Sequence, residues 1–200
     1  MPFDAHLDAV RACRRCPGMV GQPVVGRAVT GGRVYLVGQA PGPREQAIGR
    51  PFAWTAGRTL FSWFASIGLD EPAFRSRVFM AAVCRCFPGK ANGGGDRVPN
   101  PGEIANCSEW MAAEMGMLDP ELILPVGRLA IAQFLPPAPL EQIVGQIHRV
   151  EVGGRARDVL PLPHPSGAST WFRMEPGRTR LAAALGLLAA HPEWRRLLVE

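Results

Sequence analysis

The sequence has almost no lysine and no long hydrophobic run. Lys90 is the only lysine, so the other basic side chains, histidines aside, are all arginine. No stretch reaches the roughly 18 apolar residues of a membrane-spanning helix, and the first residues lack the apolar core of a signal peptide. We therefore expect a cytoplasmic protein with no membrane partner. Repeats and low-complexity tails are absent as well, so residues 1–200 are expected to form a single domain.

The composition is that of a globular protein with a basic surface. Apolar residues make up 47% of the chain, within the usual range, and 23 glycines with 20 prolines indicate many fixed loops between short elements. The formal net charge is +5. The arginine excess reflects either codon usage or a surface that binds phosphate, because guanidinium groups make bidentate contacts with phosphate oxygens. The charge permits a nucleic-acid partner without establishing one.

Apolar patterning predicts short strands that alternate with helices. Candidate strands cover residues 33–38, 77–84 and 121–126, followed by a hairpin or two adjacent strands at 143–152 and 155–162. Candidate helices cover residues 3–12, 55–68, 101–117, 128–135 and 178–198. This alternation predicts an α/β fold, a three-layer α/β/α sandwich around a central, mainly parallel four-stranded sheet. Sites in such folds lie beyond the carboxyl ends of strands, where GQAPG, AVCRC and HPSG are found.

The five cysteines form a pattern that favours metal binding. Cys13 and Cys16 form a C-x2-C pair flanked by basic residues, Cys84 and Cys86 end a candidate strand, and Cys107 lies in the next helix. In a cytosolic protein such a set is more typical of a metal site than of disulfides. Four thiolates can hold a tetrahedral zinc ion or a [4Fe–4S] cluster. The spacing chooses neither the metal nor the spare thiol of the 84/86 pair.

Four motifs together resemble the iron–sulfur, or family 4, uracil-DNA glycosylases. They are GQAPGPREQAIGRPF (38–52) with AGRTL (56–60), VCRCFPG (83–89), PGEIANC (101–107) and HPSGAS (164–169). One such motif alone is weak evidence, but here they occur in order and at compatible separations. The resemblance implies the uracil-DNA glycosylase superfamily fold, a damaged-DNA substrate in a bacterial cell, and hydrolysis of the bond between base and sugar.

The resemblance also implies which thiols bind the cofactor. It assigns a [4Fe–4S] cluster to Cys13, Cys16, Cys86 and Cys107, with Cys84 left over, because Cys86 matches the family cysteine directly before the Phe-Pro-Gly turn. The cluster is expected to be structural, to join the N-terminal loop to the 87–100 loop, and to take no redox part in catalysis. Zinc bound to the thiols is the alternative.

Three residues of these motifs are expected to carry the chemistry. His164 matches the superfamily histidine that donates toward negative charge developing on the base carbonyl. Gln39 stands where the family usually has glutamate; an amide cannot act as a general base, so Gln39 is expected to hold water or contact the base edge. Glu45 matches a later acidic position and is the nearest carboxylate able to orient water or favour an oxocarbenium-like sugar.

The expected base pocket keeps its aromatic plate but lacks the usual amide. Phe52 matches the family's stacking aromatic, whereas Ala82 stands where the family strand has an asparagine that reads uracil. Ala40 stands where some relatives carry an aspartate, and Trp54, in place of a small residue, is expected to narrow or reshape the pocket. Loss of paired hydrogen bonds can shift selectivity by orders of magnitude. The base is therefore uracil read mainly by backbone, or another damaged base.

The residues after the histidine motif are expected to contact DNA. Ser166 and Gly167 belong to a run of small residues that lets the backbone approach phosphates closely. Trp171 or Phe172, followed by Arg173, is the candidate for an apolar wedge that replaces the flipped nucleotide. The alternative for these aromatic residues is a lid packed on the terminal helix.

Together these features predict a monomeric, monofunctional DNA glycosylase that flips out and hydrolyses a damaged base, with uracil as the first candidate, and leaves an abasic site. Lys90 lies in a glycine-rich loop outside the catalytic motifs, so no Schiff-base lysine is expected. Gln39 and Ala82 favour a rival, a damaged-DNA-binding protein that has lost catalysis; the alanine also allows a glycosylase for hypoxanthine, xanthine or another deaminated base. A zinc-decorated phosphate-binding enzyme is a third possibility.

Overall fold

The computed structural model describes residues 2–29 and 33–199 and places a five-stranded sheet at the centre of the protein. The strand order is β2-β1-β3-β5-β4. All neighbouring pairs are parallel except β4 and β5, which are antiparallel. The strands are β1 (Val34–Gly38), β2 (Phe79–Ala82), β3 (Leu122–Pro125), β4 (His148–Val152) and β5 (Arg155–Val159).

The α/β class and the mainly parallel sheet are confirmed, but the expected number of four strands is wrong. Both arms of the hairpin around Gly153–Gly154 join the sheet, so β4 adds a fifth, antiparallel strand at one edge. Central β1 is buried at every position, whereas β4 alternates between half-buried and exposed residues. That difference is the one expected between a strand covered on both faces and an edge strand that faces water.

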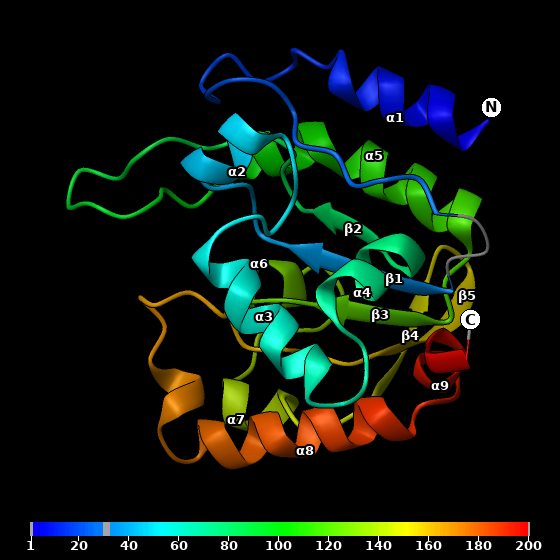
Figure 1. Cartoon of the computed structure of the whole chain (residues 1–200). Helices are drawn as coiled ribbons and strands as arrows, with labels where there is room; N and C mark the ends of the chain where they lie inside the picture. Colours follow the sequence, from blue (N-terminus) through cyan, green and yellow to red (C-terminus); the bar gives the residue numbers. More distant parts are fainter. Residues whose placement is uncertain (1, 30–32, 200) are drawn as a thin grey trace.

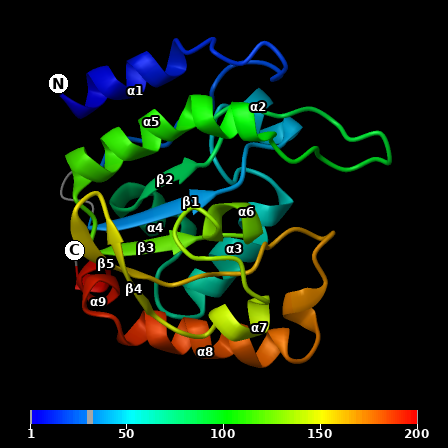
Figure 2. The same cartoon turned by 180° about the vertical axis from the view of Figure 1, so that it is seen from behind.

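Helices cover both faces of the sheet. Figure 1 shows α1 and α5 on one side and α3 and α8 on the other, and the reverse view in Figure 2 shows the same arrangement. The helices are α1 (Phe3–Arg11), α2 (Pro43–Ile48), α3 (Thr55–Ala65), α4 (Glu71–Arg77), α5 (Pro101–Leu118), α6 (Arg128–Ile131), α7 (Leu140–Ile143), α8 (Gly177–Ala190) and α9 (Pro192–Val199), with a 3₁₀ turn, η1 (Trp171–Arg173).

Several helices differ from the expectation. The single helix predicted over 178–198 is wrong, because the chain is extended at His191 and Pro192 begins a separate helix, α9. Proline lacks the N–H that would continue the preceding helix, and it disfavours a helical conformation in the residue before it. The helix expected over 128–135 is only the short α6. The short helices α2, α4 and α7 were not expected.

Aromatic side chains join three helices, α3, α4 and α9. The rings of Phe64 in α3 and Phe74 in α4 stack with centroids 4.6 Å apart, and Trp194 of α9 lies 5.3 Å from Phe64. All three side chains are buried. Because each comes from a different helix, this cluster fixes α4 against α3, and α4 carries a residue that matters for the site described below.

No helix in the described part of the chain is long and apolar enough to cross a membrane.

Candidate active site

A cavity of about 650 Å³ opens where the carboxyl ends of β1 and β2 meet the segment that follows β5. Its lining includes all the residues expected to carry catalysis and base recognition, namely Gln39, Ala40, Glu45, Phe52, Ala82 and His164. Ser166 lines it as well. Segments that are far apart in the chain therefore meet at one site, on the strand ends where parallel α/β sheets place their ligands.

His164 rests directly on the backbone after β3. Gly127 has φ +88°, and a Cβ atom there would lie 2.9 Å from Cδ2 of His164, so only glycine leaves room for the imidazole. The Ser166 N–H donates to Nδ1 of His164 at 3.3 Å. In the neutral ring the proton is therefore assigned to Nε2. Burial lowers the pKa of His164, opposed by the charge of Asp96, so the ring is neutral at pH 7.

Phe52 is held in a strained conformation at the other end of the lining. Its φ is +50°, in the left-handed region that costs a non-glycine residue about 1–3 kcal/mol. Gly38 and Gly57 make room for it: a Cβ on Gly38 would lie 2.8 Å from the ring, and one on Gly57 would lie 1.7 Å from the Phe52 carbonyl oxygen. The glycines at the end of β1 and in α3 thus serve the placement of this ring.

Arg75 of α4 holds the backbone of this segment. Its guanidinium donates to the carbonyl oxygens of Pro51 at 2.8 Å and of Phe52 at 2.9 Å, and its Nε donates to Glu71 at 2.7 Å. The same group lies 4.5 Å from the centroid of the Phe61 ring. Two backbone acceptors fixed by one planar donor offset the cost of the positive φ, which makes Arg75 a positioning residue for Phe52. The sequence contained no signal for this role.

We expect Arg75→Lys to reduce kcat/KM for base excision by about 10-fold or more, because an ammonium group cannot hold both carbonyls and the Phe52 ring shifts. Excision kinetics on a damaged oligonucleotide measure the effect. In a Phe52→Ala background the same substitution should cost less than about 2-fold, since coupled residues are not additive.

Arg77→Lys is the matched control for this prediction. Arg77 lies in the same helix and also donates to a backbone carbonyl, that of Leu197, but it is not part of the cavity lining. Equal losses from Arg75→Lys in the wild-type and Phe52→Ala backgrounds would mean that Arg75 supports only the fold.

Ala82 lies at the end of β2, opposite Gly38 in the strand register. It is half-buried and lines the cavity, so the position expected to read the base edge is in place but has no polar side chain. The nearby backbone is partly used: Val83 N–H donates to the Gly38 carbonyl and Cys84 N–H to that of Gln39. Ala40 is half-buried and belongs to the same lining.

Glu45 lies in the first turn of α2, where one carboxylate oxygen accepts the Gly42 N–H at 2.7 Å. Burial raises its pKa, and the charge of Asp96 raises it further; hydrogen bonds from the Gly42 and Ala53 backbone and the charge of Arg75 oppose the shift. One oxygen of the Glu45 carboxylate thus caps α2, and the other oxygen takes no part in that hydrogen bond.

Asp96 and Lys90 come from the loop between β2 and α5, and both line the cavity. Lys90 Nζ donates to Asp96 at 2.6 Å. Lys90 lies outside the sequence motifs, but its loop, in which Lys90 and Asp96 form a β-bridge, places it in the cavity lining. Asp96 was missed because its loop carries no motif.

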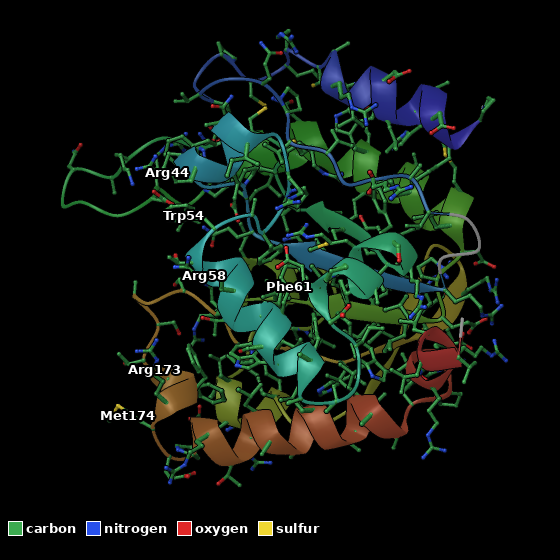
Figure 3. All side chains as sticks on the ribbon, in the orientation of Figure 1. Arg44, Trp54, Arg58, Phe61, Arg173 and Met174 are labelled. Atoms are coloured by element: carbon green, nitrogen blue, oxygen red, sulfur yellow. The ribbon has the colours of Figure 1, made fainter. Side chains whose placement is uncertain are left out.

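The residues expected to contact DNA follow His164 on the same side. Gly167 and Arg173 are exposed, and Trp171 is half-buried. Phe172 is buried, with its ring 5.1 Å from Trp63 of α3. This packing against α3 favours a core role over a wedge role for Phe172. The exposed apolar side chain at this corner is Met174, 62% accessible, which sequence reasoning missed (Figure 3).

The cysteines gather beside the cavity wall. Cys86 is within electrostatic range of Cys13, Cys16 and Cys107, the three other expected ligands. The Asn106 amide donates to Cys16 Sγ at 3.5 Å. Residues 20–24 run along the cysteine loop, since Val20 and Val24 N–H groups donate to the carbonyls of residues 87 and 85. The N-terminal segment and the 83–89 loop are thus joined where the thiols lie.

The four thiols assigned to the cofactor are half-buried or buried. Among residues 2–29 and 33–199, no three Cys, His, Asp or Glu side chains approach closely enough to hold one metal ion. A tetrahedral zinc site with 2.3 Å bonds would bring the sulfur atoms to within about 3.8 Å of each other. A four-iron cluster separates its thiolates more widely, so four half-buried or buried thiols that gather loosely are compatible with it.

A buried ionic network connects Arg85, which lies between Cys84 and Cys86, to helix α5, which carries Cys107. Glu114 of α5 accepts from both terminal nitrogens of Arg85 at 2.8 and 2.6 Å, from Tyr35 of β1 at 2.5 Å, and lies 3.3 Å from Nε2 of His6 in α1. All four residues are buried. Burial alone would raise the pKa of Glu114, but the charge of Arg85 and the hydrogen bonds outweigh it and lower the pKa.

Comparison with known proteins agrees with this geometry. The family model described as the uracil DNA glycosylase superfamily matches residues 26–186, most of the chain. The chain belongs to this superfamily. It is 29% identical to a type-4 uracil-DNA glycosylase of Archaeoglobus fulgidus, over 82% of this chain and 81% of the relative. It is 28% identical to a type-4 enzyme of Thermotoga maritima, over 80% and 79%.

A type-5 uracil-DNA glycosylase of Pyrobaculum aerophilum is also similar, 26% identical over 64% of this chain and 67% of that protein. The superfamily match includes the cavity residues of GQAPG, Phe52, Ala82 and His164, and begins after Cys13 and Cys16. The cavity thus lies within the part of the chain that defines the family.

Proposed function

We propose that this superfamily member is a type-4 uracil-DNA glycosylase that flips a damaged base, uracil first, out of DNA and hydrolyses its bond to the sugar. The observation that carries the proposal is that Phe52 and His164, 112 positions apart, line one cavity with Glu45 and Gln39. An everted base needs a flat partner, hydrogen bonds to its edge and stabilisation of the charge it acquires.

The residues divide these tasks. Phe52 stacks on the base, held by Arg75. The Nε2–H of neutral His164 donates to the base carbonyl as the bond breaks, as a preorganised donor on a half-buried ring. Glu45 orients the attacking water or favours the positive sugar, and Gln39 contacts water or the base edge through its amide. The product is an abasic site.

The charges at the site predict an acid limb in the pH profile. A carboxylate that orients water acts only when ionised, and the pKa of Glu45 is raised, so kcat/KM should fall with decreasing pH from above the ordinary glutamate value. Asp96 is the like charge that contributes to this shift, and Lys90 pairs with it. We expect Asp96→Asn to move the limb to lower pH, and Glu45→Gln to remove it, in single-turnover excision assays.

The pKa of His164 is lowered, so protonation of its ring also falls on the acid side, and comparison with Glu45→Gln separates the two contributions. Arg75, the other charge near Glu45, stays protonated throughout. A limb that survives Glu45→Gln unchanged would assign the titration to another group and leave Glu45 as the cap of α2.

The lining at Ala82 supports a second candidate, a glycosylase for another deaminated base. An alanine there removes the paired hydrogen bonds that would reject other bases. A panel of oligonucleotides bearing uracil, hypoxanthine, xanthine or a thymine mismatch, in single and double strands, separates the candidates. Uracil release supports the main proposal; release of another base alone supports the second; binding without any release supports the DNA-binding protein. Ala82→Asn should shift preference toward uracil.

A four-iron cluster on Cys13, Cys16, Cys86 and Cys107 would supply structure, with no part in the excision step. The thiols that gather beside the Glu114 network support this assignment. Metal analysis of purified protein tests it: four irons per chain and a brown colour are expected, and stoichiometric zinc in a colourless protein would overturn it.

The protein acts as a single-domain monomer in the cytoplasm of a bacterium, with DNA as its partner. Ser166, Gly167 and Arg173 meet the backbone, and Trp171 or Met174 enters the stack in place of the flipped nucleotide. It is monofunctional, because its one lysine, Lys90, pairs with Asp96 and does not act as a nucleophile toward the abasic sugar. Borohydride should therefore trap no covalent complex with abasic DNA, and a complex lost in Lys90→Arg would contradict this.

A further inference from the structure

Trp54 is an exposed aromatic side chain at the mouth of the cavity, between α2 and α3. It precedes the first residue of α3 and is 45% accessible, unusual for so large an apolar ring. Two guanidinium groups lie over it, that of Arg44 in α2 at 5.2 Å and that of Arg58 in α3 at 5.8 Å from a ring centroid. Figure 3 shows the three side chains in succession along one edge, with Trp54 between the arginines.

Among residues 2–29 and 33–199, Arg44 and Arg58 form no ion pair. Most other arginines are paired: Arg75 with Glu71, Arg97 with Glu103, Arg155 with Asp119 and Glu121. Within the described residues, no carboxylate lies within ion-pair distance of Arg44 or Arg58. Both side chains are exposed. Their charge is therefore held in place by an aromatic ring, which leaves the N–H groups free for an outside acceptor.

This rim is continuous with the cavity. Arg44, Trp54 and Thr55 belong to the cavity lining, as do Phe52 and Glu45, which hold the base end of the site. A nucleotide whose base enters the cavity leaves its own phosphates, and those of its neighbours, at the mouth. The positive charge of the two guanidinium groups, their place at the cavity mouth and their N–H donors match the phosphates of a DNA strand.

We propose that Arg44, Trp54 and Arg58 form a clamp for phosphates of the strand that carries the flipped nucleotide. The ring holds both guanidinium groups in extended positions before DNA arrives, so less side-chain freedom is lost on binding. Each group makes a charge-assisted contact with one phosphate. The proposal deepens the proposed function, on which it rests for the identity of the bound strand.

Salt-dependent binding tests the clamp without any excision step. The probe is a short fluorescent duplex carrying one tetrahydrofuran abasic analogue, titrated between about 50 and 200 mM salt. We expect Arg44→Ala and Arg58→Ala each to reduce the slope of log K against log salt by about 0.9, the value for one phosphate contact in duplex DNA. Trp54→Ala should weaken binding while keeping the slope, because both charges remain, and Trp54→Phe should restore part of the affinity.

Arg195→Ala is the matched control. Arg195 is an exposed arginine of α9, which Figure 1 shows on the side of the molecule away from the cavity loops, and its removal should leave the slope unchanged. A second measurement places the contact: single methylphosphonates beside the analogue should weaken wild-type binding at one or two positions, and weaken Arg44→Ala or Arg58→Ala no further there.

Slopes equal to that of Arg195→Ala, or methylphosphonate effects equal in wild type and variants, overturn the clamp. If wild type excises uracil while the slopes are unchanged, the clamp fails and the proposed function stands. If wild type excises no base but the slopes change as expected, the clamp stands as a DNA-binding surface and the proposed function fails.

Discussion

Replacing His164 with alanine should lower the rate of base excision by about 10²–10³-fold, the loss typical when one preorganised donor to a developing anion is removed. The imidazole is neutral, half-buried and positioned by Ser166 and Gly127. Single-turnover excision at saturating enzyme measures the chemical step, and binding to the same oligonucleotide should change little.

Two further variants make this result specific. His148→Ala is the matched control and should leave excision unchanged, since His148 is half-buried in β4, outside the cavity lining, with its Nε2 3.0 Å from the Ile143 carbonyl oxygen of α7. Gly127→Ala should give an intermediate loss, because the new methyl group displaces the His164 ring. If His164→Ala retains activity within a few-fold of wild type in a folded protein, the proposed role of the imidazole is wrong.

Glu114→Gln should destabilise the protein by roughly 3–5 kcal/mol, because it leaves the Arg85 charge buried without a counter-charge. The amide has the same shape, so the loss comes from charge and hydrogen bonding. Tyr35 and His6 also lose their ionic acceptor, which loosens α1 and β1 from α5. Denaturant unfolding, with the iron content followed in parallel, measures the change.

Glu109→Gln tests whether burial is the reason. Glu109 lies in the same helix and pairs with Arg15 at 2.6 Å, but its side chain is 71% exposed. Exposed pairs contribute at most about 1 kcal/mol. Similar losses of unfolding free energy from Glu109→Gln and Glu114→Gln would show that the buried network contributes no more than an exposed ion pair. A much larger loss in Glu114→Gln, with iron released before unfolding is complete, would show that the network supports the segments that carry the cysteines.

Much of the architecture could be predicted from local pattern. The apolar runs at 33–38, 77–84 and 121–126 correspond to β1, β2 and β3, and Pro125 ends its strand as a residue without an N–H should. The order of the motifs predicted that Phe52, Ala82 and His164 share one site, and all three line the same cavity. These features depend on spacing within short segments and on the rule that parallel strands end at one edge.

Contacts between segments that are distant in the chain could not be predicted from the sequence. Arg75 reaches Phe52 from a seven-residue helix that carries no motif, and Gly127 meets His164 only because β3 and the segment after β5 are neighbours. The addition of β4 to the sheet as a fifth strand and the formation of the short helix α2 also depend on tertiary packing more than on local sequence. Asp96 reaches the cavity through a loop bridge that no periodicity signals.

The single lysine offers a practical handle on this protein. Lys90 is 59% exposed, and apart from the α-amino group it is the chain's only primary amine. An amine-reactive dye would therefore mark one side chain at the entrance to the cavity, with no mutagenesis. In the purified protein, emission from that dye would report on whether a strand is bound, and protection of Lys90 from labelling would measure occupancy.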